Sequence, residues 1–513
     1  MVLDFIILAL YALSMVGIAI YTKNRSKSVD DFLLAGKKGL NGWMSAFSYG
    51  TTYFSAVIFI GYAGNFGRLY GLASVWIGVG NAIFGALVAW WVLAKRTKNM
   101  TARLQAKTMP EFFEKRYGDK NLKIVTAVII FLFLIPYSAS VYNGLSSLFE
   151  IVFGIPGWVI MICLAVLTAV YLFFGGYFAT SLSDFIQGII MLFGVFIMVF
   201  FFLNHENVNW DLSALTAEPN LNWFTFESTN KGIYGNTVSL VSLILLTSMG
   251  VWGLPQTIHK YYAVRDKKAI NQGMIVSTIF ALIIGFSAYF TGALSSLFPE
   301  FANVSGDKVI PYMLAKVIPV GFTGVIAVLI LSASMSTLAS VSLASASVVA
   351  VDIYKGKLNV KASDKQVNIT MRVLCLVFIL ISVVIAILNE KFQITAIAYL
   401  MGISWGTLSG CFTGPFVVGV ITKKVTRKAS WASVITSLCL TVSLIFFFGY
   451  HKNGFDCSFA TALKTGIGCS PMIGVICIIA SVVVTLVVST FTKKPSDELL
   501  YNAFDKPLEN EIK

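Results

Sequence analysis

The chain has 513 residues, of which 57% are hydrophobic and 12% are charged, and its formal net charge is +14. Soluble globular domains average roughly 45–50% apolar and about 25% charged residues, so these charges are too few to cover a soluble surface of this size. The mean hydropathy of +0.80 and the grouping of apolar residues into long blocks exclude a soluble protein. They indicate a polytopic membrane protein.

The apolar blocks each hold about 20 residues or more, enough for a helix to cross a hydrocarbon core of about 30 Å. They must be helical, because lipid leaves every backbone polar group to be satisfied within its own segment. The predicted blocks are 3–22, 41–64, 73–94, 122–149, 157–176, 182–204, 236–255, 273–296, 321–349, 370–389, 395–421, 430–450 and 471–492. The sequence therefore predicts an all-α integral membrane protein with about thirteen transmembrane helices.

The charges around the first block predict the orientation of the chain. No basic residue precedes this block and no small-residue cleavage site follows it, so it is not a cleaved signal. Lys23, Arg25 and Lys27 follow it and predict an N-terminus outside the cell and a cytoplasmic C-terminus. In this orientation most of the 38 Lys and Arg residues face the cytoplasm. Loops beside anionic lipid explain the net charge, and we expect a cell-membrane location and no nucleic-acid partner.

The cysteines and histidines do not form a metal-binding pattern. The seven cysteines form no CxxC pair, and the three histidines lie at the ends of spans without forming a metal cluster. Cys457 and Cys469 share a predicted external loop, where a disulfide between them is one alternative.

Two predicted spans are interrupted by unusual segments. Residues 48–55 place a polar patch, SYGTTYFS, inside the second block, and residues 247–255 place glycines and Pro255 inside the seventh. Proline breaks a helix because it lacks a backbone N–H. The two spans are five apart, which is the offset of discontinuous helices in transporters built from two inverted five-helix repeats. The alternative is two ordinary kinked helices.

The ninth block contains a dense series of small and hydroxyl residues at 332–347. Helical spacing places the following on one face: Ala333, Ser336 or Thr337, Ser340, Ala344 and Ser347. Such a stripe permits close helix packing, and it also offers neutral oxygen ligands for a hard cation.

Asp184 is the acidic residue beside a span core that is best placed for chemistry. A carboxylate at membrane depth is a functional-site hypothesis by default. The alternative is an N-terminal helix cap at the cytoplasmic edge.

Five segments carry a resemblance to the sodium:solute symporter family, which includes bacterial proline, pantothenate and sialic acid carriers and animal sodium/glucose carriers. They are FLLAGKKGLNG (32–42), TMPEFFEKRY (108–117), GGYFATSLSDFIQG (175–188), GLPQ (253–256) and ASMSTLASVSLASASVVAVDIY (333–354). The resemblance covers roughly residues 3–425. It implies a secondary active transporter that couples inward sodium flow to uptake of a small organic solute by alternating access.

The resemblance also implies the LeuT-type fold, in which blocks two to eleven form two inverted repeats of five helices. The expected organisation is an extra helix with its loop at 1–40, repeats at 41–204 and 236–421, two further helices at 422–492 and a cytoplasmic tail at 493–513.

The sodium ligands implied by the resemblance are backbone carbonyls of Thr51, Phe54 and Ala333 and hydroxyls of Ser336 and Thr337. Carbonyls of an unwound helix and hydroxyl groups suit a small hard ion at the membrane midplane.

A candidate second sodium site is implied at Asp184 and Ser340. However, Ala339 stands where the two-sodium sialic acid carriers have serine, so we expect one co-transported sodium.

The predicted solute site comprises uncharged residues: Thr52, Tyr53, Ser55, Tyr137, Asn143 and Trp252. Tyr53 stands where proline carriers have an aspartate, and Tyr137 stands where sialic acid carriers have an arginine, so neither specificity transfers. Burial of an uncompensated charge is costly, which favours a small neutral, zwitterionic or monocarboxylate solute such as an amino acid, with a sugar as the alternative.

A channel and a membrane enzyme are the competing classes. The sequence contains no charged ring or filter motif, and no His/Asp/Cys cluster near a membrane face that would make an enzyme. The oligomeric state is left open, a monomer being one alternative.

Overall fold

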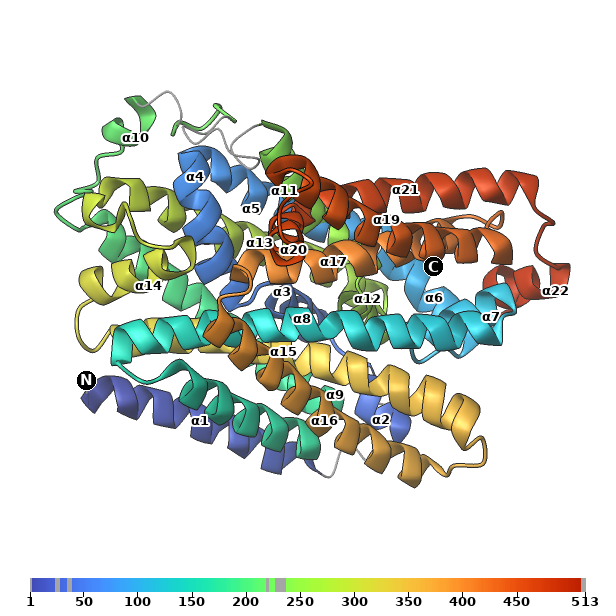
Figure 1. The fold of residues 1–513 in the computed structure, drawn as a ribbon. Helices are drawn as coiled ribbons and strands as arrows, with labels where there is room; N and C mark the ends of the chain where they lie inside the picture. The colour runs from blue at the N-terminus through green and yellow to red at the C-terminus, as the bar shows by residue number, and fades with distance from the viewer. Residues whose placement is uncertain (1, 24–27, 35–38, 218–220, 227–236, 509–513) are drawn as a thin grey trace.

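The computed structural model describes residues 2–23, 28–34, 39–217, 221–226 and 237–508. Within these ranges the chain is a bundle of long, roughly parallel and antiparallel helices (Figure 1). The one β-type pairing among them is an isolated bridge between Leu40 and Val264. Arg25 and Lys27, which contribute to the predicted orientation, lie outside the described residues, as does part of the 32–42 motif.

The described residues contain ten helices long and apolar enough to cross a membrane, or eleven if one bent pair counts as a single span. The long helices are α1 (Val2–Thr22), α8 (Lys120–Phe153), α9 (Gly157–Leu203), α13 (Lys267–Leu294), α15 (Thr323–Ser347), α16 (Asp364–Phe392), α17 (Ile397–Thr413), α19 (Arg427–Asn453) and α21 (Ser470–Phe491). The tenth span is the run Val57–Leu104. The all-α membrane architecture is therefore confirmed, while the count of thirteen stays a prediction.

Two of these ten helical runs are long enough to cross a bilayer twice. α9 has 47 residues, or about 70 Å at 1.5 Å per residue, against a hydrocarbon core of about 30 Å. Gly176 interrupts it with φ 63° and ψ −163°, a conformation that only glycine adopts easily. The 48-residue run Val57–Leu104 turns at Gly71, where φ is 55° and ψ is −138°. These breaks fall between predicted blocks five and six and between blocks two and three.

The two interrupted spans are present as predicted. α3 (Gly42–Tyr53) ends where Phe54 becomes extended, and the π-helix η2 (Val57–Gly67) continues beyond the break. In the second span, α11 (Thr237–Met249) passes through a 3-10 turn, η6 (Gly250–Gly253), into α12 (Pro255–Tyr262). The axes of this pair are bent by 49°. Proline at the first position of α12 needs no backbone N–H partner, so it starts the second half-helix.

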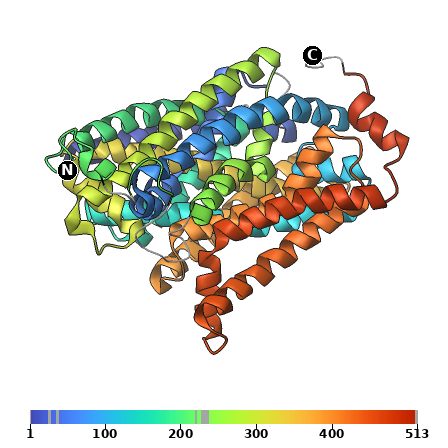
Figure 2. The ribbon, with the colours of Figure 1, turned by 90° about the horizontal axis from the view of Figure 1, so that it is seen from above.

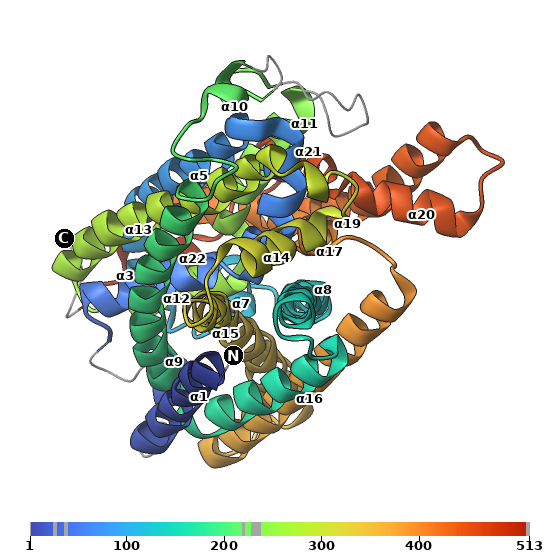
Figure 3. The same cartoon turned by 90° about the vertical axis from the view of Figure 1, so that its left-hand side faces the viewer.

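The C-terminal helices pack at one edge of the bundle. α19, α20 (Phe459–Gly468) and α21 form a hairpin coloured orange to red (Figure 2). In Figure 3 α20 stands out from the rest of the helices. No disulfide joins Cys457 and Cys469, because they lie at opposite ends of α20. A helix of its ten residues is about 15 Å long, well beyond the roughly 4.4–6.8 Å that a disulfide spans between Cα atoms.

Candidate functional site

The break after α3 faces the hydroxyl stripe of α15. Carbonyls in the last turn of a helix have no intrahelical partner, so those near the break are free to point at another element. Ser336 Oγ lies 3.0 Å from the carbonyl oxygen of Thr51 and 3.0 Å from that of Ala333. Thr337 Oγ1 lies 3.4 Å, 3.5 Å and 3.1 Å from the carbonyl oxygens of Thr51, Phe54 and Ala333. The structure thus brings together all five residues predicted to bind sodium.

This cluster has more hydrogen-bond acceptors than donors. The carbonyl of Thr52 also lies 3.3 Å from Thr337 Oγ1, so several carbonyl oxygens surround two hydroxyls. Each hydroxyl carries one hydrogen to donate. The side chains of Ser336 and Thr337 are fully buried, so water does not supply further donors freely. A buried surplus of neutral oxygens is an arrangement that suits a hard cation.

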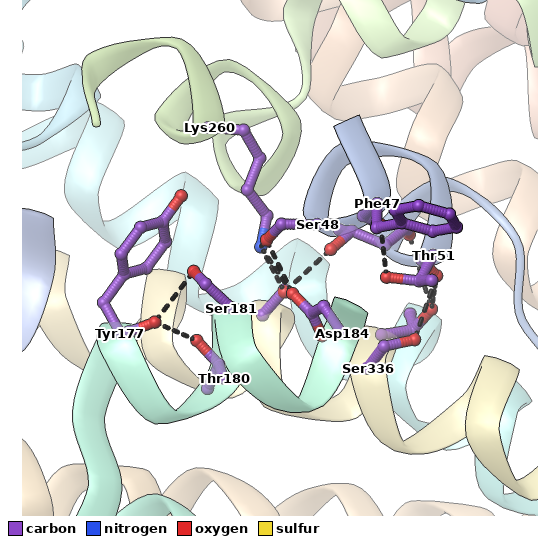
Figure 4. A network of polar contacts seen from close by, with 12 residues as sticks. Phe47, Ser48, Thr51, Tyr177, Thr180, Ser181, Asp184, Lys260 and Ser336 are labelled. Carbon is purple, nitrogen blue, oxygen red and sulfur yellow. Dashed lines mark hydrogen bonds and ion pairs between the residues drawn. The ribbon is translucent and has the colours of Figure 1, made fainter. Parts of the chain in front are cut away.

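A second polar cluster lies beside the first and contains Asp184 (Figure 4). Ser48 of α3 donates a hydrogen bond of 2.6 Å to Asp184 Oδ2. The ammonium of Lys260, on α12, lies 3.4 Å from the same oxygen and donates 2.9 Å hydrogen bonds to Ser48 Oγ and Ser340 Oγ. Asp184 lies inside the second half of α9, eight residues beyond the break at Gly176, so it is not a helix cap.

Ser340 connects the two clusters. Its hydroxyl forms a 2.9 Å hydrogen bond with Thr52 Oγ1 as well as accepting from Lys260. It lies one helical turn from Ser336 on α15, so any cation bound at the break is next to the Asp184–Lys260 pair. Thr52, predicted to contact solute, is bonded through its hydroxyl to Ser340 in this structure, and its solute role stays a prediction.

A small cavity lies on the other side of the break. Its volume is about 20 Å³, room for one water molecule. It is lined by Tyr53, Phe54, Ser55, Ile58, Tyr62, Asn81, Thr247, Tyr289, Met401 and Trp405. Tyr53 and Ser55 were predicted to contact solute. Tyr53 donates a 2.6 Å hydrogen bond to the carbonyl of Thr247, so the two broken spans meet at this cavity.

Tyr137 does not line the cavity itself but packs against Trp405, which does. The two rings pack edge to face with centroids 5.6 Å apart, and the tyrosine hydroxyl lies near the hydroxyls of Thr337 and Ser55. Neither the Tyr137 hydroxyl nor the Trp405 indole N–H makes a hydrogen bond of standard geometry among the described residues, although the two groups lie close to each other. Unpaired buried polar groups are rare in folded proteins. Several other buried groups in the described residues also lack a partner, but these two lie at or beside the cavity, where a ligand could accept their hydrogen bonds.

Two predicted solute residues lie apart from this cavity. The indole of Trp252 donates to the carbonyl of Phe84 at 2.9 Å. The amide of Asn143 donates to the Ala386 carbonyl at 2.8 Å and accepts from Asn389 at 3.0 Å. Asn143 lines a larger cavity of about 290 Å³ between α8, α14 (Gly306–Val317) and α16.

Asp307 of α14 ties the rim of this larger cavity to the broken span. One of its carboxylate oxygens accepts a 2.6 Å hydrogen bond from Asn65 of η2, and the other accepts a 3.0 Å hydrogen bond from the backbone N–H of Ile397. These contacts join η2, α14 and the start of α17 on the side predicted to face outward.

A bundle of membrane-spanning helices in which two interrupted spans, five spans apart, meet at a small buried cavity has the arrangement of the LeuT-type transporter fold. A profile of the family described as "Sodium:solute symporter family" matches residues 32–437. The chain belongs to this family, and it is a sodium-coupled solute transporter of the cell membrane, not an enzyme.

Curated relatives are similar along most of the chain. The "Osmoregulated proline transporter OpuE" of Bacillus subtilis is 28% identical over 437 residues, covering 83% of this chain and 86% of the relative. A "Sodium/proline symporter" of Staphylococcus aureus is 27% identical over 512 residues, covering 96% and 93%.

Solved structures share the fold. A sodium-coupled sialic acid symporter, described as substrate-bound and outward-open, superposes with TM-score 0.75 at 16% identity and covers 96% of this chain and 99% of its own. MhsT in complex with L-phenylalanine superposes with TM-score 0.51 at 13% identity and covers 87% and 100%.

Proposed function

We propose that this transporter takes up a small zwitterionic amino acid together with sodium by alternating access. In this proposal the N-terminus is outside, the C-terminus is cytoplasmic, and residues 41–204 and 236–421 form the two inverted repeats. Sodium binds the carbonyls and hydroxyls around Ser336 and Thr337. The observation that supports the solute class is a pair of neighbouring donors beside that sodium site, the Tyr137 hydroxyl and the Trp405 indole N–H, neither of which makes a hydrogen bond of standard geometry.

A carboxylate matches these donors. An isolated buried anion is costly to desolvate, but here a bound sodium supplies a positive charge and two neutral donors supply hydrogen bonds. An indole N–H can only donate, and a phenol can donate, so both suit an acceptor such as a carboxylate oxygen. The residues that line the cavity carry no charged side chain, so the α-ammonium would be met by neutral oxygens such as those of Ser55 and Thr247, and a further charge on the solute side chain would stay uncompensated.

The aromatic walls favour a short apolar body on the solute. The rings of Tyr53 and Phe54 stack with centroids 4.6 Å apart, and the rings of Tyr53 and Trp405 stack at 6.0 Å. A sugar needs several free polar partners, whereas the Tyr53 hydroxyl is already bonded to Thr247 and the Asn81 side chain to Ser248. The relatives named as proline transporters support a compact amino or imino acid. A monocarboxylate is the second candidate, because it presents the same oxygens.

Uptake into proteoliposomes tests the proposal. Sodium-driven uptake of labelled proline and alanine is measured with competition by lactate, glucose and the amide of each amino acid. We expect competition from the free carboxylates and weak competition from glucose and the amides. Equal competition by an amino acid and its amide would exclude carboxylate recognition.

A matched pair of tryptophan variants localises the effect. Trp405→Phe removes the donor beside the cavity and is expected to raise the KM for the solute about tenfold or more, since a hydrogen bond to a charged group contributes roughly 1.5–3 kcal/mol. Trp90→Phe is the control. The indole of Trp90 is equally buried and also lacks a partner among the described residues, but Trp90 does not line the cavity.

A further inference from the structure

Lys260 is a buried cation at a position where the sequence predicted only a cytoplasmic loop. Its side chain is 2% exposed and that of its partner Asp184 is 0% exposed. The lysine belongs to α12, whereas its three oxygen partners belong to α3, α9 and α15. The ammonium thus lies at the junction of four helices, next to the proposed sodium site.

The oxygen partners of Lys260 are the groups that would bind a second sodium. The resemblance to two-sodium carriers pointed to Asp184 and Ser340, and the structure adds Ser48. The ammonium nitrogen lies 2.9 Å from each hydroxyl and 3.4 Å from the carboxylate. A sodium ion bound to the same three oxygens would occupy nearly the same volume, so the two cations exclude each other.

Charge leads to the same conclusion. A buried carboxylate without a partner is strongly unfavourable, and Lys260 supplies the one ion pair that Asp184 makes among the described residues. The ammonium is held further by the face of the Tyr177 ring, whose centroid is 5.2 Å away. With Asp184 neutralised, a second sodium would add an uncompensated positive charge to a buried site.

We propose that the ammonium of Lys260 replaces a second co-transported sodium, so that one sodium accompanies each solute. This inference rests on the proposed sodium site at Ser336 and Thr337 and deepens it. A free ion leaves the protein with the solute, whereas Lys260 stays attached to α12. The positive charge at Asp184 is therefore not transported, and a zwitterionic solute moves with one net charge.

Equilibrium binding of ²²Na⁺ to the purified protein tests the inference without knowledge of the solute. We expect one site in the wild type and two in Lys260→Ala, because the vacated carboxylate and hydroxyls then bind sodium. The Hill coefficient for sodium-driven uptake is expected to rise from about one to about two in the same variant. Two sites in the wild type, or one site in folded Lys260→Ala, would overturn the inference.

The control for a nearby lysine is Lys98→Met. Lys98 Nζ donates to the carbonyl of Tyr262 at the end of α12, at 2.7 Å, and makes no contact with Asp184. We expect one bound sodium in this variant. Two would show that loss of any ammonium in this region admits an ion, against the inference.

A neutral double variant covers the case in which Lys260→Ala does not fold. Lys260→Met with Asp184→Asn removes the cation and its carboxylate together, and we expect it to bind one sodium. Two sodium ions would overturn the inference, because the second site would then not depend on Asp184. The proposed function fails in a different way: the wild type would then show no sodium-driven amino acid uptake, whatever its number of sodium sites.

Discussion

Substituting the two hydroxyls of the proposed sodium site gives the sharpest test of the transport mechanism. Ser336→Ala and Thr337→Ala remove side-chain oxygens but keep α15 intact, because alanine is the best helix former. The hydroxyls lie 3.0–3.5 Å from the carbonyl oxygens of the neighbouring break. A polar contact to a charged group contributes roughly 1.5–3 kcal/mol. At about 1.4 kcal/mol per tenfold change, each substitution should raise the half-saturating sodium concentration about 10–100-fold.

The double variant should lose more than either single variant but less than their product, because both hydroxyls contact one ion and their effects are coupled. The assay is the sodium dependence of uptake, with the sodium-induced rise in melting temperature as a binding readout. Ser342→Ala is the matched control. Ser342 is equally buried on the same helix, and its hydroxyl has no partner among the described residues. If all three single variants show the same sodium dependence as the wild type, the site is misplaced.

Two further predictions concern the ends of the bundle. Asp307→Ala removes an acceptor of two hydrogen bonds at the rim predicted to face outward. It should raise the rate at which an impermeant thiol reagent labels Ser147→Cys about tenfold. Loss of about 1.4 kcal/mol shifts the balance between a closed and an open form of this cavity by that factor. An equal rise in a Lys308→Ala control would refute a specific role of Asp307. Arg116→Met removes a buried guanidinium that donates to two carbonyls at the end of the last core span, at 3.2 Å and 3.0 Å. It should lower the free energy of unfolding by about 2–4 kcal/mol in thermal denaturation, whereas the exposed Lys120→Met should change it little.

The interrupted spans could be predicted because a membrane span is mostly apolar, so the residues that break its helix are easily recognised in the sequence. Glycine, proline and clustered hydroxyls stand out in an apolar segment, and the break at Phe54 and the hydroxyls of α15 were found in this way. The carbonyl ligands came from the family resemblance, since backbone oxygens leave no signal in side-chain chemistry. The structure brings both sets together.

Lys260 was missed because Pro255 was interpreted as the end of a span. Proline at the first helical position instead starts α12, which extends to Tyr262 and carries the lysine into the protein interior. A buried ion pair between distant helices depends on tertiary packing, so neither Lys260 nor Asp184 reveals its partner in the sequence. Trp405 was missed for a related reason: a tryptophan in an apolar span is equally typical of packing. The role of Asn143 stays a prediction: its amide is bonded to residues of α16, and it lines the larger cavity rather than the small one.

The small volume of the cavity beside the break bears on whether sodium can cross the protein without solute. About 20 Å³ admits no amino acid, so a solute that binds as proposed would have to separate the stacked rings of Tyr53, Phe54 and Trp405. A sodium ion passing without solute would have to shed its hydration shell against aromatic walls, at a cost of several kcal/mol. If the solute binds as proposed, the ring contact that it separates would also limit sodium leak in the absence of solute.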